Sequence, residues 1–407
     1  MIQRDFYLTI GYSYKTIRYR GDNVKIAVVV NDLELSKAGG VGSFVYELCK
    51  AFLKANQRLM LIGIINKGEN DNDEMTKELI TMGASAKCLN TRNQKDALLH
   101  FLLLAEKLRG ILNSYADGEK IICNVHLKLA ALVGTFASIN NKRISVIETY
   151  HSQYSRYYLQ AKITSPLIKK VICCSDSAYD EYIHRFGRKN DVYSIPNGID
   201  MEGIRRFATN ANQANQQERD SETTFYSVGR LSRQKNLPVS ITGFLRCSGL
   251  KAKYYIVGDG EDKEELEHII GSNNSIQLLG NLERVEVLRR IAKADMVVMP
   301  SLWEGLSIFQ LEALALGCPM MLSDISAFRQ VFNENQLNSG ELFRVCKWGY
   351  LVQTNNADAW KHAFSHYATN SCLKNEMHDM VMEISNEYDI GVTVSRYLDV
   401  FHDVIGG

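Results

Sequence analysis

The chain has 407 residues, 45% of them hydrophobic, and its 47 lysines and arginines against 46 aspartates and glutamates leave a net charge of +1. This length is typical of a globular protein with two domains of roughly 100–200 residues each. A nearly neutral chain has no general field that attracts phosphate backbones, so the composition argues against a nucleic-acid partner.

The cysteines and the apolar runs indicate the cellular compartment of the protein. The nine cysteines are scattered and none forms a C-x-x-C pair, so we expect free thiols in a reducing compartment and no structural zinc. Residues 1–23 have no apolar core of signal-peptide length, and no run approaches the roughly 18–20 apolar residues of a membrane span. We therefore predict a cytoplasmic protein, at most peripheral to the inner face of the membrane, with an N-terminal extension of unassigned function.

Strands and helices alternate over the first half of the chain. The run KIAVVV at 25–30 is apolar throughout, as in a strand buried on both faces. Residues 41–56 then repeat apolar side chains at helical spacing. The later segments predict a strand at 58–65, an amphipathic helix at 96–112, a strand and a helix within 121–134, a strand at 144–150 and a helix end entering a strand at 167–175.

This pattern lapses at residues 203–224, which are polar and lack apolar periodicity, so we predict an exposed linker there. A second alternating set begins at Phe225. Its predicted strands lie within 225–228, 254–260, 276–280 and 296–300, and its predicted helices within 261–270, 283–294 and 304–317.

Such alternation favours parallel sheets with right-handed crossovers. The sequence therefore predicts an α/β protein of two Rossmann-like domains, residues 24–202 and 225–407, whose parallel sheets face a central cleft. We expect that the last helix can pack back on the first domain. Ligands of open α/β sheets bind beyond the carboxyl ends of the strands, which places the expected site between the domains.

Segment 300–319, PSLWEGLSIFQLEALALGCP, carries two acidic residues eight apart. Glu304 lies in the predicted loop before a helix, and Glu312 lies further along that helix within its apolar pattern. A carboxylate in apolar surroundings needs a partner, which a sugar or ribose hydroxyl would supply, while the free amides of the helix start suit a diphosphate. The alternative is structural: Glu304 complements the helix dipole and Glu312 is exposed at the rim.

Segment 227–237, SVGRLSRQKNL, places two cations just beyond a strand. Arg230 and Lys235 are five residues apart, so they can straddle a diphosphate, the arginine as a planar fork and the lysine as a point charge. They would also offset charge that develops on a leaving group. Taken alone, the segment equally fits a solvated basic turn.

With IPNGID at 195–200 and YYIVGDGEDKEELEHII at 254–270, these two segments resemble the family 4 retaining glycosyltransferases of GT-B fold, of the bacterial surface-polysaccharide type. That family shows a strand, G-R-L-x-x-x-K-N, V-G-D-G, and then a strand with P-S-x-x-E-G and E-A-x-A-x-G-x-P. Every motif is present in order, firmly over 195–325 and more loosely over 25–195. The PNGID turn is predicted to shape the domain junction.

The resemblance implies roles for residues that match the motifs. Arg230 and Lys235 match the pair that binds the donor diphosphate, Glu304 matches the acid that holds hydroxyls of the transferred sugar, and Glu312 matches the acid that holds the ribose. Backbone amides are implied to meet the phosphates or the sugar at Leu306, Ser307 and Ile308. The implied reaction moves a hexosyl group from a nucleoside-diphosphate sugar, with UDP as the carrier, to a hydroxyl of a glycan or lipid-linked acceptor.

In the first half, AGGVGSF resembles the family's glycine loop before the first helix. Gly39 and Gly40 would let the backbone approach the donor or acceptor closely, although glycines also occur simply where a loop turns. His151, in ETYHSQYS, resembles the family's strand-end histidine that faces the cleft, and His126 resembles a second such position. A structural role is the alternative for each histidine.

No cofactor and no metal are expected. The dinucleotide pattern G-x-G-x-x-G fails because Val45 stands in place of its last glycine. The one Asp-x-Asp string, Asp71-Asn72-Asp73, lies in a polar loop far from the motifs and is predicted to be solvated. The two cations of segment 227–237 make a metal unnecessary for charge neutralisation.

Residues 142–170 are rich in cations and tyrosines and contain one acidic residue, Glu148. They form either a face for an anionic membrane or a lipid-pyrophosphate acceptor, or an ordinary surface over core tyrosines. The residues concerned are Lys142, Arg143, Arg156, Lys162, Lys169 and Lys170, with Tyr150, Tyr154, Tyr157 and Tyr158.

Two other classes of function fit the sequence less well. A non-catalytic GT-B sugar-nucleotide-binding or assembly protein would be expected to lack some of the four charged motif residues, and all four are present. A phosphorylase of pyridoxal type is usually a much longer chain, and an epimerase would release an altered sugar nucleotide without an acceptor. The sequence offers no evident pair of nucleophile and acid, so the resemblance implies displacement on one face with retention of the anomeric configuration.

Overall fold

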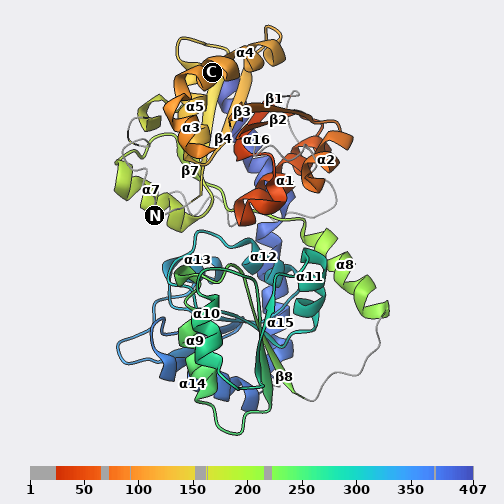
Figure 1. Ribbon diagram of the computed structural model, residues 1–407, viewed down its shortest axis with the longest axis vertical. Helices are drawn as coiled ribbons and strands as arrows, with labels where there is room; N and C mark the ends of the chain where they lie inside the picture. Colours follow the sequence, from red (N-terminus) through yellow and green to blue (C-terminus); the bar gives the residue numbers. More distant parts are fainter. Residues whose placement is uncertain are drawn as a thin grey trace.

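In the computed structural model, the chain forms two α/β halves stacked along the long axis of the molecule (Figure 1). The structure describes residues 24–65, 73–91, 93–151, 162, 164–214, 222–370 and 373–406. Within these residues each half contains a sheet of seven strands. This is the predicted α/β fold class, with helices packed on both faces of each sheet.

The first sheet is parallel and has the order β3-β2-β1-β4-β5-β6-β7. Its central strands are almost wholly buried because helices cover both faces, which is why they read as continuous apolar runs. The strands are β1 Lys25–Asp32, β2 Arg58–Ile65, β3 Ser85–Thr91, β4 Ile121–His126, β5 Ile144–Tyr150, β6 Lys170–Cys173 and β7 Val192–Ser194.

The helices of the first half connect these strands. The predicted helix over 96–112 is two helices, because the backbone leaves the helical region at His100, where φ is −111° and ψ is 21°. The helices are η1 Leu35–Lys37, α1 Gly39–Lys54, α2 Glu74–Thr81, α3 Gln94–Leu99, α4 Phe101–Ala116, α5 Lys128–Ser138, η2 Ser165–Leu167 and α7 Asp176–Phe186.

The second sheet has the order β10-β9-β8-β11-β12-β14-β13, parallel except for the antiparallel pair β13–β14. Its strands are β8 Thr223–Val228, β9 Ala252–Val257, β10 Ile276–Gly280, β11 Met296–Met299, β12 Met320–Ser323, β13 Phe343–Cys346 and β14 Gly349–Val352. Its helices are η3 Arg233–Lys235, α9 Leu237–Leu245, α10 Lys263–Ile270, α11 Arg284–Lys293, α12 Ile308–Ala315, α13 Ser326–Phe332, α14 Ala357–Thr369, α15 Leu373–Ser385, η4 Asn386–Tyr388 and α16 Ile390–Gly406.

The segment predicted as a linker begins inside a helix. Residues 201–214 form α8, and residues 215–221 of the predicted linker lie outside the described part. Met201, Ile204 and Ala208 are buried, and α8 contacts α11 and α12. The prediction of an exposed linker is wrong here because these few apolar residues already have helical spacing, which the polar tail of the segment obscures.

The last helix, α16, returns to the first half (Figure 1). Phe401 packs on Phe52 of α1 with ring centroids 5.7 Å apart, and Tyr397 lies against both Phe44 and Phe52. Lys120, just before β4, donates to the Ile405 carbonyl at 2.8 Å. The end of the chain therefore braces the sheet that carries the two histidines.

The PNGID turn lies where the chain passes between the halves. The Ile199 amide donates to the Tyr388 carbonyl at 3.1 Å, and the Ile390 amide donates to the Ile199 carbonyl at 2.9 Å. A Cβ at Gly198 would lie 2.9 Å from the Ile390 Cα and 2.5 Å from the Thr393 hydroxyl. Only glycine allows this approach, so the turn joins the first half to the start of α16.

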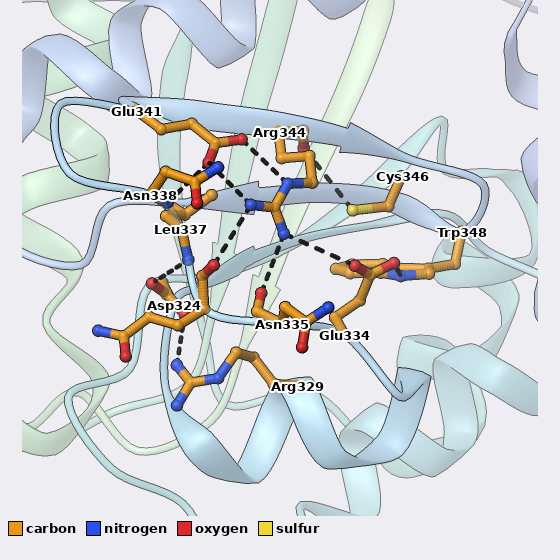
Figure 2. Close-up of polar contacts among 11 residues, drawn as sticks. Asp324, Arg329, Glu334, Asn335, Leu337, Asn338, Glu341, Arg344, Cys346 and Trp348 are labelled. Atoms are coloured by element: carbon orange, nitrogen blue, oxygen red, sulfur yellow. Dashed lines mark hydrogen bonds and ion pairs between the residues drawn. The ribbon is translucent and has the colours of Figure 1, made fainter.

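A cluster of charged side chains holds the loop between α13 and β13 (Figure 2). Arg344 of β13 donates to Glu341 at 2.7 and 2.9 Å and to the Asn335 carbonyl at 3.0 Å. Asp324, which follows β12, accepts from the Leu337 amide at 3.0 Å. The charges of this cluster satisfy one another and the loop backbone, so they serve the fold at this rim of the second sheet.

The described cysteines form no disulfide bonds with one another, and most are buried; Cys372 lies outside the described residues. Burial raises the pKa of the Cys123 thiol to about 12, so this thiol is unreactive at neutral pH. Within the same part of the chain, no helix combines the length and the apolar character needed to cross a membrane.

Candidate active site

Lys235 and Glu304 form the centre of a polar cluster at the carboxyl ends of β8 and β11. The Lys235 Nζ lies 2.6 Å from Glu304 Oε1. The Ser301 hydroxyl donates to the same oxygen at 2.8 Å, and the side-chain amide of Gln234 donates to Glu304 Oε2 at 3.2 Å. Only 7% of the Glu304 side chain and 19% of the Lys235 side chain are exposed. The pair is thus fixed by a charge-assisted bond and by neutral donors.

Two loops come together to build this cluster. The Leu302 amide donates to the Gln234 carbonyl at 2.8 Å, and the Asn236 side chain donates to the Pro300 carbonyl at 3.1 Å. Asn236 has a φ of 50°, a left-handed conformation that asparagine tolerates better than most residues. The K-N pair of the motif therefore supplies the cation and the turn that binds the facing loop.

A small pocket lies beside the cluster, and Gly229, which lines it, is in close contact with Gly258. Gly229 has a φ of 145° and Gly258 a φ of 135°. A Cβ at Gly258 would collide with the Gly229 carbonyl oxygen, and a Cβ at Gly229 would lie 3.1 Å from the Lys235 Cε. The pocket is lined by Ser227, Val228, Gly229, Lys235, Leu237, Ile256, Val257, Val298, Met299, Pro300 and Ser301.

Gly258→Ala is expected to lower the free energy of unfolding by at least about 2 kcal/mol, because strain at positive φ adds to a backbone collision. Thermal unfolding should show a Tm about 4–8 °C below that of the native chain. Gly110→Ala is the matched control, because its exposed helical position has no atom within 4 Å of a new Cβ. An equal Tm for the Gly258 and Gly110 variants would contradict the proposed close approach.

Arg230 lies apart from this cluster. Its side chain is 75% exposed, and its Nε pairs with Glu261 at 2.9 Å. Among the described residues it makes no recorded contact with Lys235 or Glu304. The structure therefore does not bring the two predicted diphosphate ligands together, because the arginine extends outward from the loop after β8.

The glycines at the start of α1 face the start of α12 across the two halves (Figure 1). A Cβ at Gly40 would lie 3.7 Å from the Ile308 Cγ1, and Gly39 has a φ of 62° with open space around its Cα. Leu306 and Ile308 direct their side chains inward, since both are under 10% exposed. The structure thus brings together two segments that the sequence places at the site, the glycine loop and the helix start.

Glu312 has a protein partner. Its Oε1 accepts from Arg284 Nε at 2.7 Å, and Arg284 also reaches Glu47 of α1 at 3.4 Å. Burial raises the pKa of the Glu312 carboxyl, and the Arg284 cation lowers it. A buried Glu312 was expected to need a ligand as its partner, but Arg284 is that partner and links the two halves.

Arg284→Met is expected to lower the free energy of unfolding by about 3 kcal/mol at pH 8, because it leaves two buried carboxylates without a cation. Burial raises the pKa of both Glu47 and Glu312, so without Arg284 each ionises at a cost to the folded state. That cost is absent while both are protonated and grows as the pH rises through their pKa values. Thermal unfolding at pH 5 and pH 8 should show the larger deficit at pH 8.

The control for this prediction is Arg246→Met. Arg246 pairs with Asp358 at 2.8 Å, but both side chains are at least half exposed, so its loss should change the Tm little at either pH. A deficit for the Arg284 variant that is the same at pH 5 and pH 8 would rule out buried carboxylates as its cause.

The two histidines lie next to each other at the carboxyl edge of the first sheet. His126 ends β4, His151 follows β5, and His126 Nδ1 is 3.0 Å from His151 Nε2. Burial lowers the pKa of His151 to about 4 and that of His126 well below its usual value, the latter lowered further by His151. Both rings are therefore neutral at physiological pH.

His126 is placed differently from the prediction. It is fully buried, and its second nitrogen is 2.8 Å from Asn124 Oδ1. Both ring nitrogens are therefore engaged within the protein, one with Asn124 and the other with His151. Phe44 of α1 packs against both rings, with its centroid 5.7 Å from that of His151.

Some side chains of the basic segment 142–170 lie on the surface and others lie in the interior. Lys142, Arg143 and Lys169 are exposed, whereas Lys170 is buried and pairs with Asp403 of α16. Tyr150 is also interior and donates to Glu181 at 3.0 Å. Arg156, Tyr154, Tyr157 and Tyr158 lie outside the described residues.

Asp73 of the Asp-x-Asp string caps a helix. Its carboxylate accepts from the Thr76 amide at 3.2 Å and from the Ser36 amide at 3.1 Å, so it is not simply solvated as predicted. Asp71 and Asn72 lie outside the described residues. No group of three or more histidine, cysteine or acidic side chains suited to a metal occurs in the described part of the chain.

Sequence reasoning assigned no role to four residues that the structure places in or behind the site. Gln234 and Ser301 lie inside the quoted motifs, where their polar character was the available signal. Asn124 is the polar residue within the apolar strand IICNVH, which also marks it. Arg284 carries no such signal, because its partners are 28 and 237 residues away.

The fold and the site together define a class of protein. Two Rossmann-like halves face each other, and motif residues gather at strand ends opposite a glycine loop, as in glycosyltransferases of GT-B fold. Solved structures share this fold. An Anabaena protein, Alr3699/HepE, solved in complex with UDP and glucose, aligns at a TM-score of 0.73 and 15% identity over 93% of this chain and 99% of that chain. A glycosyltransferase from Rickettsia africae ESF-5 aligns at 0.73 and 15% identity over 95% and 99%.

The family follows from the sequence comparisons. Residues 38–202 match the model of Glycosyltransferase Family 4, and residues 209–383 match that of Glycosyl transferases group 1. The chain belongs to glycosyltransferase family 4.

Two relatives span most of the chain. The Escherichia coli UDP-Gal:alpha-D-GlcNAc-diphosphoundecaprenol alpha-1,3-galactosyltransferase is 25% identical over 77% of this chain and 80% of its own length. The Mycobacterium leprae phosphatidyl-myo-inositol mannosyltransferase is 26% identical over 71% of this chain and 75% of its own length.

Proposed function

We propose that this protein transfers a hexosyl group from a UDP-sugar to a hydroxyl of a lipid-linked or growing bacterial surface glycan, with retention of the anomeric configuration. The observation that carries the proposal is the Lys235–Glu304 cluster at the ends of β8 and β11, beside the start of α12 and the glycine loop of α1. This arrangement offers a cation, a fixed carboxylate and helix-start amides within one region between the halves.

Each part of the site has a role in this proposal. Lys235 binds the diphosphate, which also accepts from the free amides at the start of α12. Arg230 joins it by exchanging its exposed contact with Glu261 for the diphosphate. Glu304 accepts from hydroxyls of the transferred sugar, in exchange for part of its contacts with Gln234 and Ser301. Glu312 accepts from the ribose through the oxygen that Arg284 leaves available.

The reaction breaks the bond between the sugar C1 and an oxygen of the β-phosphate, and the acceptor oxygen bonds to C1 on the same face. The proton of the acceptor hydroxyl passes to the leaving phosphate oxygen. Lys235 and Arg230 stabilise the charge that develops on the diphosphate. His151, at the end of β5, lines the sugar site. Closure of the halves over the donor excludes water and limits hydrolysis.

The relatives support the proposed donor and acceptor. The Escherichia coli relative is named for UDP-Gal and a diphosphoundecaprenol-linked sugar, and the Mycobacterium leprae relative is named a phosphatidyl-myo-inositol mannosyltransferase. An Anabaena protein of the same fold was solved with UDP-glucose. An acceptor anchored in a membrane places the proposed reaction at the inner face of the cell membrane.

The experiment that tests the proposal incubates the protein with UDP-galactose, UDP-glucose, GDP-mannose or an ADP-sugar, with and without lipid-linked glycans extracted from bacterial membranes. We expect acceptor-dependent release of UDP, transfer of label to the lipid fraction, a retained anomeric configuration by NMR, and an unchanged rate in EDTA. A thermal-shift screen with the free nucleotides checks binding separately. Nucleotide binding without transfer would favour a non-catalytic protein, and an altered sugar nucleotide without an acceptor would indicate an epimerase.

A further inference from the structure

Asn124 is a fully buried polar residue in the middle of an apolar strand, and its amide is held in one orientation. Its Nδ2 donates to the Ile147 carbonyl at 3.1 Å and to the Thr149 hydroxyl at 3.0 Å. Because a carbonyl oxygen can only accept, the NH2 group must face Ile147. The Oδ1 therefore faces His126, and it can only accept.

This orientation determines where the protons lie on the two histidines. His126 Nε2 is 2.8 Å from Asn124 Oδ1, so that nitrogen carries the proton. A neutral imidazole has one N–H, which leaves His126 Nδ1 as an acceptor. His151 Nε2 lies 3.0 Å from that acceptor and must donate to it. The Nδ1 of a neutral His151 is then without a proton.

We infer that Asn124 and His126 are positioning residues that fix the tautomer of His151, so that His151 presents an unprotonated Nδ1 to a hydroxyl of the sugar substrate. This inference rests on the proposed function and specifies it. An acceptor nitrogen selects a hydrogen-bond donor, so the group it takes is a sugar hydroxyl and not a phosphate or carboxylate oxygen. His151 is partly exposed at the strand end that faces the second half, as such contact requires.

The surroundings of the pair keep both rings neutral. Phe44 of α1 covers both rings, and Tyr397 of α16 reaches Thr149 at 3.3 Å. Glu148 lies one residue from Thr149 and so points to the opposite face of β5, where Lys128 is its counter-charge.

Four charged groups on the two covering helices pair with residues away from the histidines, and Asp399 of α16 is exposed. On α1, Glu47 pairs with Arg284, Lys50 with Glu78 and Lys54 with Asp200. On α16, Asp403 pairs with Lys170. The proton positions therefore follow from hydrogen bonds within the chain Asn124–His126–His151.

NMR of the protein labelled with ¹⁵N-histidine tests the inference without any activity assay. Long-range ¹H–¹⁵N spectra distinguish the two neutral tautomers from the cation, and His126→Asn and His151→Asn assign the two signals by their loss. We expect His126 and His151 each to carry one proton, on Nε2, at pH 7. A proton on Nδ1 of His151, or a cationic ring, would overturn the inference.

A kinetic test uses Asn124→Asp and follows UDP release from UDP-galactose or UDP-glucose. A carboxylate beside His126 favours the doubly protonated form of that ring. Its Nδ1–H would then donate to His151 Nε2, so the hydrogen bond between the two histidines would be reversed. We expect kcat to fall about tenfold or more, by analogy with tautomer-setting residues elsewhere, with the donor KM nearly unchanged and the acid limb of the pH–rate profile moved to higher pH. An acid limb at the same pH as in the native pH–rate profile would overturn the inference.

Three variants separate proton placement from folding. His126→Asn keeps an acceptor near the Nδ1 position and should retain more of kcat than His126→Leu, which removes it; equal kcat values would count against the inference. Ser145→Ala, in β5, removes a buried hydroxyl that has no hydrogen-bond partner in the described chain, and should match the native profile. If the native protein releases no UDP, the proposed function fails, while the NMR result still decides the tautomer.

Discussion

Replacing Lys235 with alanine is expected to lower turnover by about a thousandfold or more. The Lys235 ammonium is the cation that the cluster holds at the end of β8, 2.6 Å from Glu304. In the proposed reaction it offsets charge that appears on the diphosphate as the C1–O bond breaks. Pre-positioned groups of this kind act in the transition state more than in the ground state, so kcat should fall further than donor affinity.

The fold should survive this change, because Glu304 keeps its bonds from the Ser301 hydroxyl and the Gln234 amide. Release of nucleoside diphosphate and the Tm should be measured on the same preparation. Arg233→Ala is the matched control, since Arg233 is an exposed cation in the same short helix η3. Turnover of the Lys235 variant within about tenfold of native would remove Lys235 from the proposed machinery.

The sequence predicted the elements that carry the cluster because local patterns determine them. Lys235 follows a buried strand, and Glu304 lies between a buried strand and a helix. Adjacent parallel strands end at the same edge of the sheet, so loops after β8 and β11, which pair directly, must meet. That topology brings a lysine and a glutamate 69 residues apart in sequence into contact.

Other features depended on side chains that meet from distant segments. Arg284 reaches Glu47 in the other half, and His126 finds both of its partners behind the sheet edge. Spacing along the chain encodes neither contact. The sequence could therefore place His126 at a strand end and Glu312 in a helix, but not show that the first is fully buried and the second already paired.

The unpredicted elements of the fold have a similar explanation. β3 lies at the edge of the first sheet, and its seven residues are exposed or half-buried apart from Leu89, so the strand lacks the apolar run of a central strand. α2 and α7 are short and begin at side-chain caps, Asp73 and Ser175. Edge strands and capped short helices depend on neighbours and single hydrogen bonds, which periodicity does not reveal.

Glu304→Gln is expected to lower turnover by about a hundredfold to a thousandfold, a loss typical of removing one group that stabilises a transition state. Glutamine keeps the shape but offers one acceptor where the carboxylate offers two. In one orientation its NH2 faces the Lys235 ammonium and the Ser301 hydroxyl, and in the other it faces the Gln234 side-chain amide. A donor therefore meets a donor in both orientations. Glu267→Gln, on the surface of α10, is the control and should leave turnover unchanged. A Glu304 variant with near-native turnover would show that its charge is not used.

Combining Lys235→Ala with Glu304→Gln distinguishes one shared site from two independent ones. If Lys235 and Glu304 act as one unit in the transition state, removing either already loses most of the effect of that unit. The double variant should then be no more than about tenfold worse than the poorer single variant. Independent residues would instead give the product of the two losses. The bond between Lys235 Nζ and Glu304 Oε1 is the only direct link recorded between these two side chains in the described structure, so a multiplicative result would mean that this bond has no part in turnover.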